Sequence, residues 1–394
     1  MYKNIVFAIC GCLFYVNGFS QSSTIERILK EIEQNNTELK GYQSYINSQQ
    51  LENKSTNNLP DPQFSGFYLP FGRKTTGDYT EFQISQSFEY PTVYAARDKW
   101  NLSKTEQLES AYAKRRQEVL LSAKNNLLEL AFFQKQKTIE LERRAQSKRV
   151  FDQIQELFDK EQVGILDLNK AKIAWMQEQF VVEQIDSDIQ IEISKLKTLN
   201  GGIPIEVISS QILLPAEIGT IENLWKDKLT SDPRFQELKA NETASFLKIN
   251  LEKSKTLPNM AFGLNYQGVR GSNYSGFYGG ISIPLWNSKY KVEAAEANHN
   301  YQQSNTQIIT SSIYSEFQET YIRYELMLEK YNEYKAVIGD LNSESLLFEA
   351  YKLGEYSFMD YYMELQFHRN ASDKMLQMEK ELHVLQAQLL KHQL

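Results

Sequence analysis

The chain has 394 residues and a formal net charge of −7, with 41% hydrophobic and 24% charged residues. That length allows two or three ordinary domains or one very elongated domain. The acidic balance argues against a nucleic-acid partner, because phosphate backbones attract basic surfaces. No run reaches the roughly 18 consecutive apolar residues of a membrane-spanning helix.

The first 20 residues are expected to be a secretory signal peptide. Lys3 precedes an apolar run at residues 5–16, and small residues follow it. Both cysteines, Cys10 and Cys12, lie in this segment, so we expect a mature chain without a disulfide or a cysteine metal site. Residues 9–12 loosely resemble a bacterial lipobox, which leaves lipidation of Cys12 as an open alternative.

The next element is a helix at about 24–54, for which Ser23 and Glu26 form a capping box and in which a break is expected near Asn36. The pattern then changes to a period of two. Residues 79–90 alternate between apolar and polar side chains, which predicts a strand with one face of each kind. A poorer alternation at 63–71 supplies its hairpin partner, and a second hairpin is predicted at 259–269 and 275–286.

Long helices follow each hairpin. From Pro91 to about residue 161 no Gly or Pro interrupts the chain, which predicts a helix of roughly 70 residues, or ~105 Å. Gly164 is expected to end it in a left-handed conformation, before a return helix at 167–199. The apolar stripe of that return helix is predicted to comprise Val181, Ile185, Ile189, Ile193 and Leu196.

The second half of the chain repeats this order. A linker at 200–219 contains two glycines and two prolines, and helices are predicted at about 220–255, 288–352 and 359–391, with Gly354 at the last turn. The short helix 220–255 is expected to stack end to end on the return helix, and the helix 24–54 to complement the second long helix.

Similar segments recur at offsets close to 196 residues, which indicates an internal duplication. TIERILK at 24–30 matches TIENLWK at 220–226, and Leu59-Pro60 matches Leu257-Pro258. We therefore divide the chain into a signal peptide (1–20), a first repeat (21–199, with its helical tip at 162–166), a linker or equatorial region (200–219) and a second repeat (220–394, with its tip at 352–356).

The strands determine the expected class of protein. Four strands with an apolar outer face cannot close a barrel, and open apolar edges are unfavourable in lipid and in water. Partner chains must therefore close the sheet. Eight strands would leave a filled interior, whereas twelve from a trimer leave a wet lumen. The small or polar inner residues favour the trimer; they include Glu81, Gln83, Ser85, Ser87, Asn265 and Gln267. A surface hairpin that caps a coiled coil is the alternative.

Duplicated motifs add a family resemblance. They are LFDKEQVGILDLNKA at 157–171 with LFEAYKLGEYSFMDY at 347–361, Leu59-Pro60-Asp61-Pro62, Ser231-Asp232-Pro233-Arg234 and Ile84-Ser85-Gln86. With them the mature chain resembles the TolC family of outer-membrane efflux channels, and more weakly the CusC/CzcC-like branch.

That resemblance implies a mainly helical homotrimer with a twelve-stranded membrane β-barrel and a periplasmic α-helical barrel. The protein would lie in the outer membrane of a Gram-negative bacterium and extend into the periplasm. It would passively conduct drugs or heavy-metal cations expelled by an inner-membrane pump, preferably of the resistance-nodulation-division type, through a periplasmic adaptor protein. The duct of a type I protein secretion system and a secreted structural coiled-coil protein are the alternatives.

The resemblance also assigns candidate sites. The helical tips that would contact the adaptor are Val163, Gly164, Ile165, Leu353, Gly354 and Glu355. The periplasmic aperture would contain an acidic residue six positions after the tip glycine, which is Asp360, with Glu364 one turn later. The matching position in the first repeat is Lys170, with an acid displaced to Asp167. A solvated helix face is the alternative role for these residues.

No catalytic or cofactor motif accompanies these features. The sequence contains no nucleophile elbow, zincin motif or phosphate-binding glycine loop. The four histidines (His299, His368, His383 and His392) are scattered, and we expect them to be surface residues rather than metal ligands. Neither an enzymatic activity nor a cofactor is predicted.

Overall fold

The computed structural model describes residues 20–70, 77–206, 218–269, 271–286, 288–338 and 343–394. The predicted signal peptide, with Cys10 and Cys12, therefore lies outside the described residues except for Ser20, as does most of the linker. The helices are α1 (Ser20–Asn35), α2 (Thr37–Ser55), α3 (Pro91–Asp159), α4 (Ile165–Leu199), α5 (Ile221–Ser231), α6 (Pro233–Ser254), α7 (Lys291–Ile338), α8 (Ser343–Lys352) and α9 (Phe358–Leu389), with a short 3-10 turn, η1 (Lys391–Gln393). The strands are β1 (Gln63–Leu69), β2 (Tyr79–Phe88), β3 (Asn259–Val269) and β4 (Ser272–Ser282). Among the described helices, none combines the length and the apolar character needed to cross a membrane.

A buried polar side chain lies between the two short helices of each pair, α1–α2 and α5–α6, and caps the second helix. Asn36 stands between α1 and α2 and is 3% exposed, and its Oδ1 accepts a hydrogen bond from the N–H of Leu39 at 3.0 Å. Asp232 stands between α5 and α6 with no exposed surface, and its Oδ1 accepts from the N–H of Arg234 at 3.0 Å. Such caps satisfy N–H groups that the first turn of a helix leaves without partners. The predicted break near Asn36 is confirmed.

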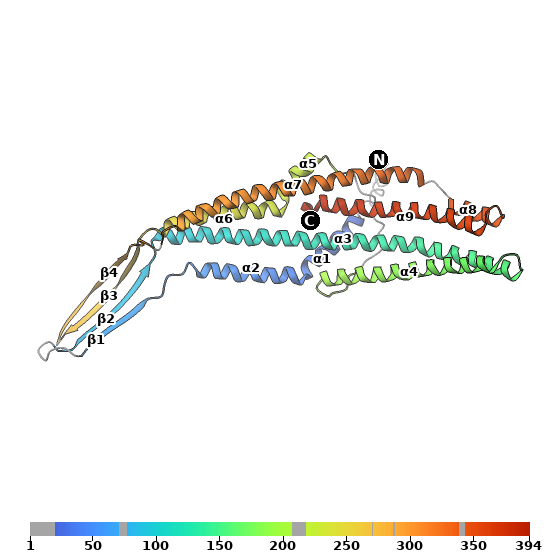
Figure 1. Cartoon of the computed structure of the whole chain (residues 1–394). Helices are drawn as coiled ribbons and strands as arrows, with labels where there is room; N and C mark the ends of the chain where they lie inside the picture. The colour runs from blue at the N-terminus through green and yellow to red at the C-terminus, as the bar shows by residue number, and fades with distance from the viewer. Residues whose placement is uncertain (1–19, 71–76, 207–217, 270, 287, 339–342) are drawn as a thin grey trace, which may run out of the picture. The chain divides into compact units, whose positions relative to one another are not determined.

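The strands form one antiparallel sheet in the order β1-β2-β3-β4. Both predicted hairpins are present, and β2 pairs with β3 to join them (Figure 1). The prediction for β4 was three to four residues too late. Ser272 pairs with Val269, so the turn is shorter than the sequence indicated, and Gly271 adopts the positive φ of 85° that this turn requires. Pro284 follows the end of the strand and has no N–H for a ladder.

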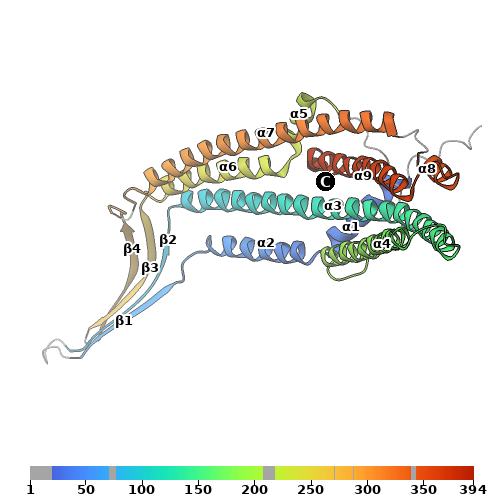
Figure 2. The same cartoon turned by 45° about the vertical axis from the view of Figure 1, so that its right-hand side comes forward.

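The chain forms two compact units, and each contains segments from both halves of the sequence. The sheet unit comprises Gly41–Lys114 and Thr230–Ile313, and the hairpin-tip unit comprises Arg115–Leu229, Tyr314–Leu394 and the described part of Met1–Lys40. In the sheet unit, the helices lie side by side in the order α2, α3, α6, α7 in both views (Figures 1 and 2). The strands β1 to β4 continue from the ends of these helices.

The hairpin-tip unit corrects one expectation about helix stacking. The end of α4 meets the α1–α2 junction, where Asn36 Nδ2 donates to Leu199 O at 2.9 Å and Asn35 Nδ2 donates to Asn200 Oδ1 at 3.0 Å. The prediction that the helix 220–255 continues α4 is therefore wrong. A turn at Gly201, with a φ of 66°, reverses the chain there, and a Cβ on this glycine would lie 2.4 Å from Asn35 O. Only glycine allows this close approach.

Candidate functional site: a two-faced sheet and the tips of two helical hairpins

The register of the sheet collects the predicted lumen residues on one face. Glu81 pairs with Gln267, Gln83 with Asn265, and Ser85 with Gly263. Cross-strand partners point to the same side of an antiparallel sheet, so the six predicted residues share one face. The sequence prediction did not establish this pairing between hairpins that are far apart in the chain.

Glu81 is the centre of a hydrogen-bonded group on this polar face. Its Oε2 accepts from Tyr79 OH at 2.6 Å, and its Oε1 accepts from Asn265 Nδ2 at 2.6 Å and from Gln267 Nε2 at 3.4 Å. The polar face can therefore hold a carboxylate with satisfied hydrogen bonds. Leu69 and Phe67 in β1 share this face through their pairing with Tyr79 and Glu81, so the polar character is weaker along β1.

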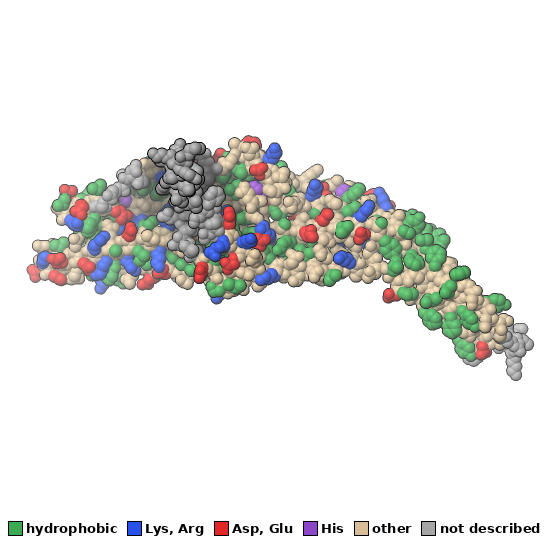
Figure 3. Space-filling model, turned by 180° about the vertical axis from the view of Figure 1, so that it is seen from behind, with side chains coloured by type: hydrophobic (Ala, Val, Ile, Leu, Met, Phe, Trp, Pro, Cys, Tyr) green, Lys and Arg blue, Asp and Glu red, His purple; other side chains and the backbone are tan. Residues whose placement is uncertain are grey.

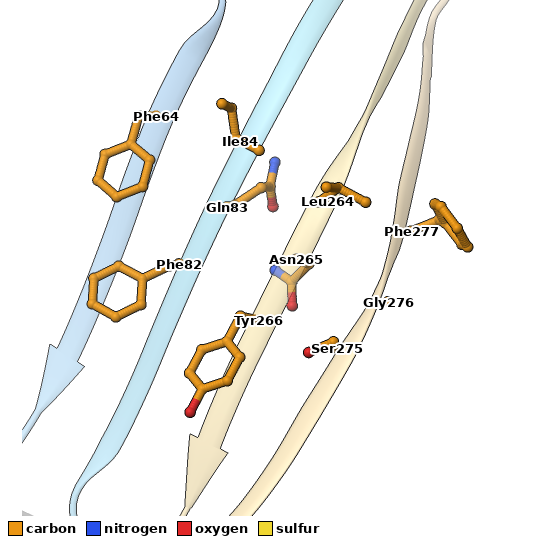
Figure 4. Close-up of a pocket in the computed structure, with 10 residues that line it drawn as sticks. All are labelled: Phe64, Phe82, Gln83, Ile84, Leu264, Asn265, Tyr266, Ser275, Gly276 and Phe277. Atoms are coloured by element: carbon orange, nitrogen blue, oxygen red, sulfur yellow. The ribbon is translucent and has the colours of Figure 1, made fainter.

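The opposite face of the sheet is apolar and open. Its exposed side chains include Phe64 (72%), Phe82 (45%), Ile84 (49%), Phe262 (59%), Leu264 (56%), Phe277 (94%) and Ile281 (73%). Hydrophobic side chains gather over the strands in Figure 3. Phe64, Phe82 and Tyr266 lie beside one another across β1, β2 and β3 (Figure 4), with ring centres 6.0 and 6.4 Å apart. They line a hollow of about 430 Å³ on this face.

The first helical hairpin turns through a Schellman motif. The N–H of Gln162 donates to Leu157 O at 2.9 Å, and the N–H of Glu161 donates to Phe158 O at 2.9 Å. Glu161 is the left-handed residue, with φ of 57°. The prediction that Gly164 has this role is wrong, because Gly164 is the N-cap of α4 and has extended backbone (φ −84°, ψ 161°).

The second helical hairpin uses the same motif with a glycine in the left-handed position. The N–H of Glu355 donates to Ala350 O at 3.0 Å, and the N–H of Gly354 donates to Tyr351 O at 3.0 Å. Gly354 has φ of 76°, which confirms its predicted conformation. The residue that corresponds to Gly164 in position is therefore Ser357, the N-cap of α9.

Alignment of the two N-caps, Gly164 and Ser357, changes which predicted aperture residues occupy equivalent positions in the two hairpins. Asp167 is the third residue of α4 and Asp360 is the third residue of α9. The sequence register had aligned Asp360 with Lys170, because it matched two glycines that have different structural roles. Lys170 lies 4.0 Å from Asp167 Oδ1 on its own helix. Asp360 and Glu364 are exposed, and Asp360 Oδ2 accepts from Ser357 Oγ at 2.6 Å.

The predicted tip residues differ in exposure. Ile165 is 52% exposed and Leu353 is 75% exposed, and Gly164, Gly354 and Glu355 are also exposed. Val163 is instead half-buried against a core cluster below the tips. That cluster comprises Val150, Ile154, Leu168, Ala171, Phe358, Tyr361 and Leu365, so it joins α3, α4 and α9. The two hairpins therefore pack against each other near their tips.

A buried arginine above this cluster was missed by the sequence analysis. The Arg369 side chain is 4% exposed, and its Nη1 lies 2.5 Å from Glu178 Oε1 of α4. Its Nη2 donates to Gln146 Oε1 of α3 at 3.1 Å, and its Nε lies 3.6 Å from Glu344 Oε1 of α8. The available signal was spacing, since Arg369 follows Tyr361 and Leu365 at four-residue steps on the buried face of α9.

The histidines correct another expectation. His383 is 8% exposed and His392 is 7% exposed, so the prediction of surface histidines is wrong for these two, because both lie on inward faces of the C-terminal helices. Burial lowers the pKa of His383, against an opposing effect of Glu379. His299 lies with Nδ1 2.8 Å from Ser245 Oγ. Within the described ranges, no three His, Cys, Asp or Glu side chains gather closely enough to hold a metal ion.

Comparisons with known proteins identify the fold. No protein-family model matches the sequence, and no curated protein sequence matches it closely enough to indicate a relative. Solved structures do match. CusC, described as undergoing transmembrane channel formation, aligns with a TM-score of 0.78 over 96% of this chain and 95% of its own, at 12% identity. The chain has the fold of the outer-membrane channels.

Two further structures agree with this assignment. A membrane protein from Pseudomonas aeruginosa aligns with a TM-score of 0.78 at 12% identity, over 93% of this chain and 92% of its own. The outer-membrane channel OprN aligns with a TM-score of 0.73 at 14% identity, over 94% of this chain and 89% of its own. The mainly helical, channel-like fold that the resemblance to the TolC family predicted is thereby confirmed for the single chain.

Proposed function

We propose that this protein is the outer-membrane channel subunit of a tripartite efflux system and belongs to the TolC family. Three copies would form a twelve-stranded barrel in the outer membrane of a Gram-negative bacterium and a helical tunnel in the periplasm. One observation carries the proposal. A four-stranded sheet leaves an apolar face open, and among the described residues β1 and β4 each pair with only one other strand.

Closure of three sheets into one barrel accounts for both the free edges at β1 and β4 and the open apolar face. Three sheets joined β4 to β1 remove all free edges, and lipid covers the apolar side chains. Twelve strands enclose water, whereas the eight strands of a dimer are filled by side chains. The lumen would then be lined by the hydrogen-bonded group around Glu81, together with Gln83, Ser85 and Ser87.

Exposed apolar stripes on the helices also support an assembly of copies. On α4 they comprise Leu166 (71%), Ile173 (55%), Met176 (55%) and Phe180 (64%), and on α9 they comprise Met359 (38%), Met363 (55%) and Phe367 (71%). These positions recur every three, four or seven residues, so each set occupies one side of its helix. Neighbouring protomers would cover them in a helical barrel.

The helical tips are the proposed contacts with a periplasmic adaptor, which would link the channel to an inner-membrane pump. Ile165 and Leu353 offer apolar surface next to exposed backbone at Gly164 and Gly354. Gly164 tests this contact well, because its backbone is ordinary and a Cβ there would have no atom within 4 Å. Gly164→Phe should therefore leave the assembled channel intact and abolish export. Normal export by this variant would show that the first tip makes no essential contact.

The aperture proposal follows the structural register. Asp167 and Asp360 at equivalent helix positions would place six carboxylates at the periplasmic end of a trimer, with Glu364 one turn further and Lys170 beside Asp167. A ring of this kind attracts cations and repels anions. Single-channel conductance in a planar bilayer tests it, since Asp167→Asn with Asp360→Asn should reduce cation preference. Unchanged ion selectivity would place the aperture elsewhere.

The proposed class of transported substrate rests on the sequence resemblance. We favour drugs or heavy-metal cations delivered by a proton-driven pump over secreted proteins, and the Leu59-Pro60-Asp61-Pro62 motif adds a weaker similarity to the cation-efflux branch. CusC and OprN, whose structures match, are described as channels and not as enzymes, which supports a passive duct without a catalytic site. A type I protein secretion duct is the second candidate and uses the same sheet and tips.

Cell fractionation provides the direct test of location. The protein should appear in the outer-membrane fraction and run as a trimer in unboiled detergent samples. A water-soluble monomer would instead support the secreted coiled-coil alternative.

A further inference from the structure

A groove in the sheet unit lies outside every site described above. It runs between α3, α6 and α7 and has a volume of about 680 Å³. That volume is within the usual range for sites that hold small organic molecules. Ala244 and Ala295 are buried beneath it at 4% and 7% exposure, so short side chains on α6 and α7 leave the space.

Positive charge is concentrated along this groove. Its lining includes Lys104, Lys248, Lys255 and Lys291 but only one carboxylate, that of Glu252. The groove therefore carries an excess of three positive charges in a chain whose formal net charge is −7. A local charge opposite in sign to the rest of the protein attracts an oppositely charged ligand.

The carboxylate of Glu252 already contacts two of the lysines that line the groove. Glu252 Oε1 lies 2.9 Å from Lys248 Nζ and 3.2 Å from Lys255 Nζ. Burial acts to raise the pKa of Glu252, but hydrogen bonds and charges from these two lysines outweigh it and lower the pKa. Glu252 is thus ionised at neutral pH, and it compensates no more than one of the two ammonium groups.

An indole ring lies within the same cluster. The centre of the Trp100 ring is 4.2 Å from Lys248 Nζ and 4.6 Å from Lys104 Nζ. Cation–π contact orients both ammonium groups without neutralising them. For Lys104, no carboxylate of the described chain lies within ion-pair distance. Trp100 itself also lines the groove next to these charges.

We propose that this groove binds a small organic anion that combines a carboxylate or sulfonate with an aromatic ring. Lys104 and Lys248 bind the anionic group, and Trp100 packs against the ring. Further along the groove, Asn298 and Gln302 offer neutral hydrogen-bonding groups. The inference concerns the sheet unit alone and does not depend on trimer formation or on the helical tips.

The test measures binding of 1-naphthoate to the full-length protein in detergent by equilibrium dialysis. The matched cation, 1-naphthylmethylamine, has the same ring and the opposite charge. Naphthoate should bind and the amine should not. Because partly exposed charge pairs contribute up to about 1 kcal/mol, Lys104→Gln should weaken naphthoate binding roughly fivefold. Raising the salt concentration well above about 0.1 M should also weaken it.

Matched variants separate the groove from general surface charge. Lys99→Gln removes an exposed lysine of α3 that does not line the groove, and it should leave binding unchanged. Ala294→Phe fills the groove without changing charge and should abolish binding, whereas Ala297→Phe, also exposed on α7, should not. Equal helical circular dichroism of all variants establishes that they fold.

Three results would overturn the proposal. They are absent naphthoate binding, equal binding of the anion and the amine, and binding that Lys104→Gln and Ala294→Phe do not reduce below their controls.

Discussion

Replacement of Arg369 by alanine should cost the hairpin-tip unit about 3 kcal/mol of unfolding free energy. The Arg369 side chain is 4% exposed and its partner Glu178 is 12% exposed. Removing one member of a buried ion pair leaves the other charge desolvated and without compensation, which typically costs about 3–5 kcal/mol. We use the lower end of this range of free energies, because the Glu178 side chain retains some contact with water.

The double variant Arg369→Ala/Glu178→Ala separates the charge effect from lost packing. It removes the uncompensated carboxylate, so it should be more stable than Arg369→Ala alone. Arg323→Ala provides the control, since this arginine is exposed on α7 and its loss should change stability by no more than about 0.5 kcal/mol.

Urea-induced loss of the helical circular dichroism signal, measured in detergent, gives the free energies. Fluorescence should report the same transition, since a single cooperative transition is needed for the comparison. A cost below about 1 kcal/mol for Arg369→Ala, or a double variant less stable than the single one, would refute this account of the buried pair.

Three further predictions concern backbone geometry and pH. Gly263→Ala should prevent formation of a detergent-resistant assembly, because its Cβ would lie 2.1 Å from a carbonyl oxygen of β2, whereas Gly276→Ala, with no atom within 4 Å, should assemble normally on unboiled gels. Glu161→Gly should stabilise the hairpin-tip unit by about 1 kcal/mol and Gly354→Ala should destabilise it by a similar amount, because both positions have positive φ; equal urea midpoints would contradict this. The lowered pKa of His383 means that the unfolded chain takes up a proton that the folded chain does not, so stability should fall as pH decreases below about 6.5. His383→Leu should reduce that pH dependence, and identical urea midpoints for both proteins across the range would contradict the assignment.

Regular periodicity made much of the fold predictable. The alternation in residues 79–90 and the absence of Gly and Pro after Pro91 identified β2 and α3 to within two residues at each end. Both patterns are local, and each is long enough to distinguish a period of two from one of 3.6. The predicted polar face of the sheet is likewise confirmed as one face by the β2–β3 register.

Features that depend on tertiary contact were not predictable. On α4 the sequence indicated Val181 as part of the buried stripe, whereas Val182 is buried at 3% exposure and Glu192 at 5%. Neighbours on both sides of the helix widen its buried face, so a single row of β-branched residues does not define it. The sequence prediction of one helix over 288–352 also missed the end of α7 at Ile338, although Gly339, the next residue, was an available helix-ending signal.

The helical tips illustrate a different limit. Sequence comparison aligned Gly164 with Gly354, but the hydrogen bonds align Glu161 with Gly354. A non-glycine residue in the left-handed position hides the end of a helix from a search for glycine. The corrected register places Asp167 and Asp360 in equivalent positions. The motif comparison had instead matched Asp360 with Lys170.

Native mass spectrometry of the protein extracted from membranes tests the central claim most directly. Closure of a four-stranded sheet into a barrel with a wet lumen predicts a particle of three chains. A particle of one chain that is soluble without detergent would contradict the channel, and two chains would contradict the water-filled lumen.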